Sequence, residues 1–220
     1  MPDRSQFNHL LRQQQAVLVA CNRYLVQRLQ AQQCAYEALD ATAVPTRDAK
    51  RRGLGGLPGV VDIGWSHRLG WYQGVHLLLS VNPAGVITGF GSAPATTKDP
   101  LLAETFFAGR HQPHPHLPSV GAPALGPYVT DKGFEGTAWH QHWQHAYGAE
   151  VICAPKRNSK RPWSRAWRRW LAGIRQIVET VNGCLHQVFR LNRERPHDLS
   201  GFGTRLSAKV ALHNFQQFPL

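Results

Sequence analysis

The feature that most constrains the fold is a pair of strand-like runs joined by a tight turn. Residues 71–81 are rich in aromatic and aliphatic side chains and form the clearest strand of the chain. Residues 82–85 read Asn-Pro-Ala-Gly, which is turn chemistry, and residues 86–90 are again β-prone. Because two strands this close along the chain pair with each other, the sequence predicts an antiparallel hairpin within a sheet.

Further strands and helices are predicted on both sides of this hairpin. In chain order they are strands at 36–45, 71–81 and 86–90, a helix that begins near Lys98, a strand at 128–130, a helix at 137–147, a strand at 149–155, and helices at 163–189 and 203–215. A hairpin followed by helical crossovers implies an α/β fold, a mixed sheet with helices on both faces.

A short helical segment is expected before the sheet. Residues 5–33 are Gln-rich and lack glycine, and their apolar side chains recur at roughly helical spacing. The segment is interpreted as core-capping helix, and a recognition helix of a helix-turn-helix is the open alternative. We therefore divide the chain into an N-terminal helical segment, 1–34, and an α/β domain, 35–220.

The composition favours a polyanionic partner. The chain has 220 residues, with 25 Lys and Arg against 13 Asp and Glu, for a net charge of +12. Such a balance favours nucleic acid first and a membrane surface second. No apolar run approaches the ~18 residues of a membrane span, the N-terminus does not resemble a signal peptide, and the four cysteines form no C-x-x-C pair. We expect an intracellular protein with free thiols.

Three acidic residues stand where a catalytic site could form. Asp40 lies within an early strand, Asp131 follows the 128–130 strand, and Glu179 lies on the long helix. If these three carboxylates lie close together in the fold, they repel one another unless a divalent cation neutralises them. Mg²⁺ or Mn²⁺ would suit such a site, because both ions prefer oxygen ligands. Arg175 and Glu179 are four residues apart, so an ordinary surface ion pair remains an alternative for Glu179. Asp62 is the alternative to Asp40.

These motifs, taken in order, resemble the DDE transposases of bacterial insertion sequences. The similarity runs over about residues 35–215. Its motifs are Leu39-Asp-Ala-Thr-Ala-Val-Pro45, then Gly70-Trp-Tyr-Gln-Gly-Val-His-Leu-Leu-Leu-Ser-Val-Asn82 with its hairpin, then Tyr128-Val-Thr-Asp-Lys-Gly-Phe134, and Arg175-x-x-x-Glu179.

The resemblance implies an RNase H-like catalytic domain that cuts and joins DNA strands. Asp40, Asp131 and Glu179 would be its acidic triad and would hold two Mg²⁺ or Mn²⁺ ions. The implied partners are double-stranded DNA, as element ends and target, and a second copy in a synaptic homodimer. The implied location is the bacterial cytoplasm, at the nucleoid.

This chain departs from the family pattern at two points. Some relatives carry a Tyr-Arg-Glu-Lys signature on the last helix, and the Tyr and Lys positions are Ala172 and His186 here. The phosphate contact of that lysine is assigned to His186 or Lys132. Full-length members also usually have an N-terminal DNA-binding domain, so a short or truncated member is expected. A non-catalytic, basic nucleic-acid-binding protein is the alternative.

Residues 156–170 form the densest basic run. Arginine grips phosphate bidentately, and binding it releases counterions, so this run is predicted to contact the DNA backbone together with Arg175. Its cationic members are Lys156, Arg157, Lys160, Arg161, Arg165, Arg168 and Arg169. The three tryptophans among them lie on one helical face and are interpreted as core.

Two groups of histidines could in principle bind a transition metal. They are His111, His114 and His116 in a proline-rich loop, and His140, His142 and His145 on the helix that follows Asp131. Their spacing is irregular and no cysteine is adjacent, so solvated surface histidines are the favoured interpretation.

Overall fold

A computed structural model describes residues 6, 9–10, 13–53, 57, 59–111, 123–155 and 163–218. In chain order its elements are α2 (Gln15–Arg28), β1 (Glu37–Pro45), η1 (Ala49–Arg51), β2 (Asp62–Ser66), β3 (Gly70–Val81), β4 (Ile87–Pro94), α3 (Asp99–His111), β5 (Tyr128–Thr130), η2 (Lys132–Phe134), α4 (Thr137–Tyr147), β6 (Val151–Cys153), α5 (Arg165–Gln187), η3 (Leu191–Arg193) and α6 (Leu199–Phe215).

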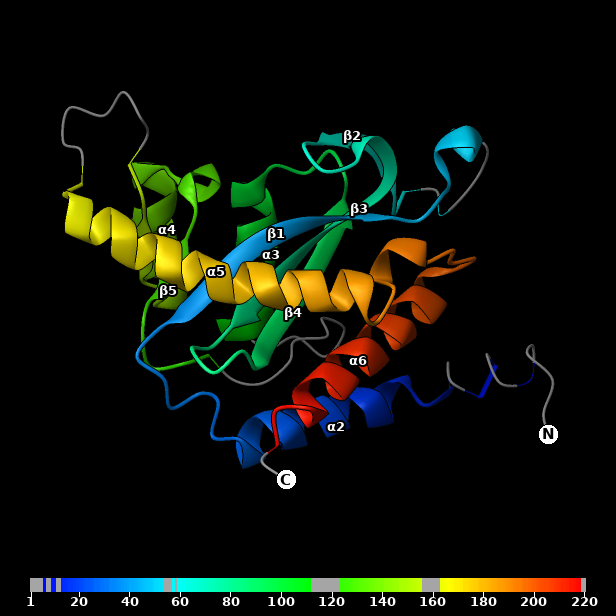
Figure 1. Cartoon of the computed structure of the whole chain (residues 1–220), viewed down its shortest axis with the longest axis horizontal. Helices are drawn as coiled ribbons and strands as arrows, with labels where there is room; N and C mark the ends of the chain where they lie inside the picture. Colours follow the sequence, from blue (N-terminus) through cyan, green and yellow to red (C-terminus); the bar gives the residue numbers. More distant parts are fainter. Residues whose placement is uncertain are drawn as a thin grey trace.

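The six strands form one mixed sheet in the order β2-β3-β1-β5-β6, with β4 also paired to β3. The pairs β1–β3, β2–β3 and β3–β4 are antiparallel, whereas β1–β5 and β5–β6 are parallel. Figure 1 shows α5 crossing this sheet. The fold is the predicted RNase H-like mixed α/β fold, and the hairpin of β3 and β4 is confirmed. Strand β2 was not predicted.

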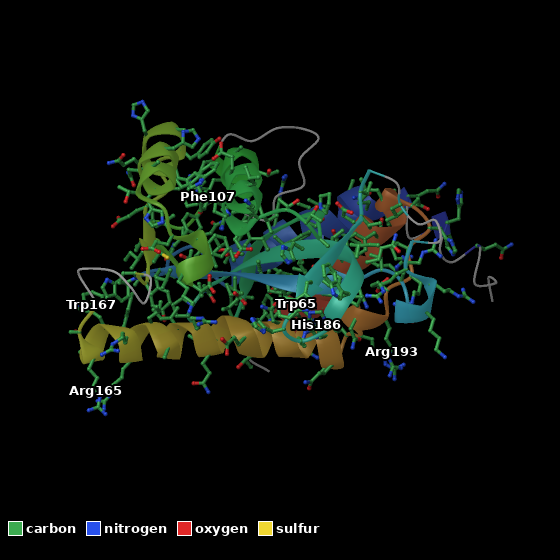
Figure 2. The ribbon with its side chains drawn as sticks, turned by 90° about the horizontal axis from the view of Figure 1, so that it is seen from above. Trp65, Phe107, Arg165, Trp167, His186 and Arg193 are labelled. Atoms are coloured by element: carbon green, nitrogen blue, oxygen red, sulfur yellow. The ribbon has the colours of Figure 1, made fainter. Side chains whose placement is uncertain are left out.

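The two faces of the sheet are covered by different helices, because successive side chains of a strand point to opposite faces. On β1, Ala38 and Val44 pack in a core with α5, α6 and α2, whereas Leu39 packs in a second core with α3 and α4. Figure 2 shows α5 on one side of the sheet and α3 and α4 on the other. The predicted helices on both faces are confirmed.

Helix α2 precedes the sheet and lies against α6 (Figure 1). The Asn22 amide donates to the Ser207 carbonyl at 2.9 Å, and Val26 is fully buried in the core beneath α5 and α6. This packing agrees with the core-capping interpretation of the N-terminal segment. Among the described residues no helix is both long and apolar enough to cross a bilayer.

The outer edge of β4 is occupied near its start by a side chain of α6. The backbone N–H of Ile87 donates to Asn214 Oδ1 at 2.9 Å, and Asn214 Nδ2 donates to the Ile87 carbonyl at 2.9 Å. Asn214 is fully buried. Its amide group therefore bonds to β4 as a neighbouring strand would.

A buried ion pair joins β1 to α3. Arg110 donates to both carboxylate oxygens of Glu37, at 2.7 and 2.9 Å, and neither side chain is exposed. The Ser80 hydroxyl also donates to Glu37 at 2.8 Å, and the guanidinium lies over the rings of Phe106 and Tyr128. Because each charge is fully matched, the pair can exist within the apolar core.

Removing only the cation should therefore destabilise the fold strongly. For Arg110→Met we expect a loss of about 3–5 kcal/mol in the free energy of unfolding, because Glu37 stays buried without its partner. Urea denaturation measures the loss. The double variant Glu37→Gln/Arg110→Met should lose clearly less, and an equal loss in both variants would show that packing rather than charge is responsible.

Candidate active site

The parallel pairing of β1 and β5 brings two of the predicted acids together. Leu39 lies opposite Thr130 in the register, so the next residues on the two strands are Asp40 and Asp131. The carboxylate of Asp131 is held by the first turn of η2, where Oδ1 accepts a hydrogen bond from the Gly133 N–H at 2.7 Å. The end of β5 thus places Asp131 next to Asp40, and the hydrogen bond from Gly133 fixes the orientation of its carboxylate.

Asp40 points toward α5, where Asn182 Nδ2 donates to Asp40 Oδ2 at 3.1 Å. Burial and the negative charge of Asp131 together raise the pKa of Asp40 to about 7, although the charge of Arg175 acts in the opposite direction. The charge of Glu179 also raises this pKa. Asp40 is therefore within electrostatic reach of both other predicted acids, and a cation placed here would relieve their repulsion.

Glu179 lies on α5, and its carboxylate is paired with an arginine of the same helix. Arg175 Nη2 donates to Glu179 Oε1 at 3.1 Å, and the two side chains are 43% and 57% exposed. Within the described residues, no group of three His, Cys, Asp or Glu is close enough to hold a metal ion. The structure therefore places Asp40 beside Asp131 and leaves Glu179 on the facing helix, paired with Arg175.

The donor chemistry at this point fits a hard divalent cation. Asp40 and Asp131 supply carboxylate oxygens, which Mg²⁺ and Mn²⁺ prefer. The amide oxygen Oδ1 of Asn182 is buried and has no hydrogen-bond partner among the described residues, although its Nδ2 bonds to Asp40. A buried acceptor beside a buried carboxylate is costly unless a donor or cation is present.

The model of the transposase DDE domain family matches residues 38–215. The chain belongs to this family. No protein of curated function matches the sequence significantly. The matched range begins on β1 and ends at the last residue of α6, so it contains every element that carries the three acids.

The other candidate for the first acid of this transposase domain is far from Asp131. Asp62 lies at the start of β2 and is opposite Gly74 of β3, so β3 separates it from β1. Its carboxylate accepts from the Thr96 hydroxyl at 2.7 Å and from the Ile63 N–H at 2.8 Å, and these bonds lower its pKa. The register therefore favours Asp40 over Asp62.

A further acid, Asp99, lies beside Asp131. It is the first residue of α3, and a Cβ added at Gly133 would clash with its Oδ2 and lie 2.9 Å from Asp131 Oδ1. Burial raises the pKa of Asp99, His76 lowers it, and the charge of Asp131 raises it. In the sequence, Asp99 is visible only as an acid in the first turn of a predicted helix, which does not indicate its place beside Asp131. The glycine of the Asp131-Lys-Gly motif is needed because two carboxylates meet at its Cα.

His186 lies in a polar seam between β1 and α5. Its Nε2 is 3.2 Å from the Thr42 hydroxyl and 3.1 Å from Arg68 Nη2, and Arg68 also donates to the Ala43 carbonyl at 2.9 Å. Burial and the charge of Arg68 lower the pKa of His186 to about 4. His186 is thus neutral and only 4% exposed, which argues against a cationic phosphate contact. The positive charge at this place belongs to Arg68.

The cations predicted to contact DNA are placed as follows. Lys132 is exposed on η2 directly after Asp131, and Arg165, Arg168 and Arg169 are exposed on the first turns of α5. Figure 2 shows Arg165 pointing away from the sheet. The remaining members, Lys156, Arg157, Lys160 and Arg161, lie outside the described residues.

The tryptophans beside these arginines form an aromatic row rather than a buried cluster. Ring centroids of Trp163 and Trp167 are 5.8 Å apart, and those of Trp167 and Trp170 are 5.2 Å apart. Trp163 packs on the core, whereas Trp167 is 53% exposed. The interpretation of all three as core is wrong for Trp167 and for Trp170, which is 37% exposed, because α5 extends past the edge of the apolar core at its start.

Three of the described histidines of the two predicted groups make hydrogen bonds within the protein, and His145 is exposed on α4. His142 bonds to Glu104 at 3.0 Å, His140 to the Phe134 carbonyl at 3.0 Å, and His111 to the Tyr128 hydroxyl at 2.8 Å. His114 and His116 lie outside the described residues. The metal-binding alternative gains no support from these contacts.

The burial of neutral His186 predicts a pH dependence of stability. Its folded pKa of about 4 lies below the ordinary value of about 6.5, so the unfolded chain binds more protons between these values. The stabilisation is complete above about pH 6.5 and is lost as the pH falls toward 4. As the pH falls through this window, the difference in unfolding free energy between wild type and His186→Gln should shrink by up to about 1.4 kcal/mol per pH unit. Parallel curves would contradict the assignment. The opposite contribution of Asp40 is common to both proteins and cancels.

Proposed function

We propose that this chain is a transposase that cuts DNA at the ends of an insertion sequence and joins the freed strand to target DNA. The observation that carries the proposal is the β1–β5 register, which sets Asp40 beside Asp131 under α5. A basic domain around an acidic centre suits chemistry on a phosphodiester.

Asp40, Asp131 and Glu179 are proposed to hold two Mg²⁺ or Mn²⁺ ions. When bound, such a pair activates the attacking oxygen and stabilises the leaving oxygen of a phosphoryl transfer. Asn182 orients the Asp40 carboxylate, and the Gly133 N–H orients that of Asp131. Outer contacts of this kind fix ligand geometry and contribute to affinity.

Arg175 has two roles in this proposal. In the structure it neutralises Glu179, with which it shares the hydrogen bond of 3.1 Å. If Glu179 turns to an ion, the guanidinium is released beside the site and can bind a DNA phosphate bidentately. Lys132, exposed next to Asp131, offers a second phosphate contact as a point charge.

Double-stranded DNA, as element ends and as target, is the proposed partner, and a homodimer would hold two ends together. The proposed location is the bacterial cytoplasm, on the nucleoid. A second candidate function is a DNA-binding protein without catalysis. It is favoured by one observation: Glu179 is ion-paired with Arg175, and among the described residues the three acids do not form a group close enough to hold a metal ion.

Loss of a proposed metal ligand should abolish cleavage without abolishing DNA binding. With a duplex taken from the DNA that flanks the gene and Mg²⁺ or Mn²⁺, Asp131→Ala should nick more than about 100-fold more slowly than wild type, since loss of outer contacts alone costs 10–100-fold. Asp62→Ala is the matched control and should nick normally. If wild type binds the duplex but nicks it no faster than Asp131→Ala, the non-catalytic candidate is correct.

Two neighbouring arginines of α5 should differ in their contribution to binding. Arg168 lies seven residues, or about two helical turns, before Arg175 and is therefore on the same side of α5 as Arg175 and Glu179. The side chain of Arg169 is rotated by about 100° about the helix axis from that of Arg168. Arg168→Ala should flatten the plot of log affinity against log salt by about 0.9, the value for one lost phosphate contact. Arg169→Ala should change it less. Equal slopes for the two variants would place the DNA elsewhere.

A further inference from the structure

A basic cleft of about 140 Å³ lies where β1 ends and α6 begins. This volume could hold a few water molecules, at about 30 Å³ each, or a phosphate group. Two segments far apart in the sequence form it, one after β1 and one after η3. The residues that line it are Thr46, Arg47, Asp48, Arg51, Arg195, Pro196 and His197.

The cleft has more positive than negative charge. Asp48 is ion-paired with Arg195, and Arg195 also donates to the Glu194 carbonyl at 2.7 Å, so this guanidinium is held at the wall. Within the part of the chain that the structure describes, Arg47 and Arg51 form no ion pair of their own. Guanidinium groups gathered around a small concave space suit an oxyanion, which can accept their hydrogen bonds in pairs.

The cleft is aligned with the acidic site along β1. Thr46 follows Asp40 by six residues, and at about 3.3 Å per residue this is a distance of about 20 Å. Successive phosphates of one DNA strand are about 3.4 Å apart along the helix axis. The spacing corresponds to the axial rise of about six base pairs.

The cleft and the described cations of the basic run, Arg165, Arg168 and Arg169, lie toward opposite ends of α5. The helix has 23 residues and is therefore about 35 Å long, which is close to one turn of B-DNA. Figure 2 shows Arg165 at one end and Arg193 near the other, both pointing away from the sheet. A duplex that lies along α5 would present its backbone to both ends at once.

We propose that the cleft between η1 and residues 195–197 binds a backbone phosphate of the DNA held at the acidic site, at a point about 20 Å along the duplex from the reacting phosphate. This inference rests on the proposed function, because it requires DNA as the ligand. It adds a contact that the basic run 156–170 does not provide, and it fixes the direction of the duplex along α5.

The test uses the full chain and a duplex of about 30 bp, roughly three helical turns. Arg47→Ala/Arg51→Ala should flatten the plot of log affinity against log salt by about 0.9 for each lost contact. The control is Arg23→Ala/Arg28→Ala, which removes the same charge from exposed positions of α2, a helix that α6 separates from α5 (Figure 1). The control slope should be unchanged, and both variants should melt as wild type does.

A second readout locates the contact. Single methylphosphonates are placed in turn on either strand, within about ten base pairs of the cleaved bond. At one of these positions the modification should weaken binding by wild type and should not weaken binding by the cleft variant any further. If wild type binds and nicks DNA while the cleft variant keeps the wild-type slope, the cleft proposal fails and the proposed function stands. Equal flattening in the α2 control also overturns it, because the effect is then long-range charge. If wild type does not bind DNA, both proposals fail.

Discussion

Strand β1 pairs antiparallel with β3 and parallel with β5, and this double pairing determines what each of its side chains meets. Ala38, Asp40 and Thr42 face α5, whereas Glu37 and Leu39 face α3. A slip of one residue in the pairing of β1 would exchange the two faces of the strand. Asp40 would then face α3 and Glu37 would face α5. The acidic site and the buried ion pair therefore depend on the same register.

Two faces of helix α5 have different roles, because its 3.6 residues per turn point successive side chains in different directions. One face contributes Leu171, Val178 and Leu185 to the core, and the adjoining stripe places Asn182 and His186 over β1. Asp40 is buried beneath that stripe with a raised pKa, so the protein holds a carboxylate where water cannot fully solvate it. A carboxyl group whose pKa is raised by burial and by a neighbouring charge is typical of a functional site.

Much of this fold and part of the site could be predicted from the sequence. Asp131 was recognisable because glycines bracket a β-prone run that ends in an acid, and parallel pairing then brings it to Asp40. Asn182 and Asp40 are 142 residues apart in the sequence, and Arg68 and His186 are 118 residues apart. No local sequence pattern could therefore have predicted these two contacts. Likewise the basic cleft unites two segments that appear separately as ordinary loop arginines.

The hydrogen bonds of Asn214 to Ile87 bear on how two copies could associate. Sheet edges are natural places for a second chain to add a strand, and a buried amide already fills both bonding positions at the start of β4. A dimer built by continuing the sheet at this point would first have to expel Asn214 from the core. In the proposed homodimer, contact through helices, loops or the DNA itself is therefore favoured over a shared sheet at the start of β4.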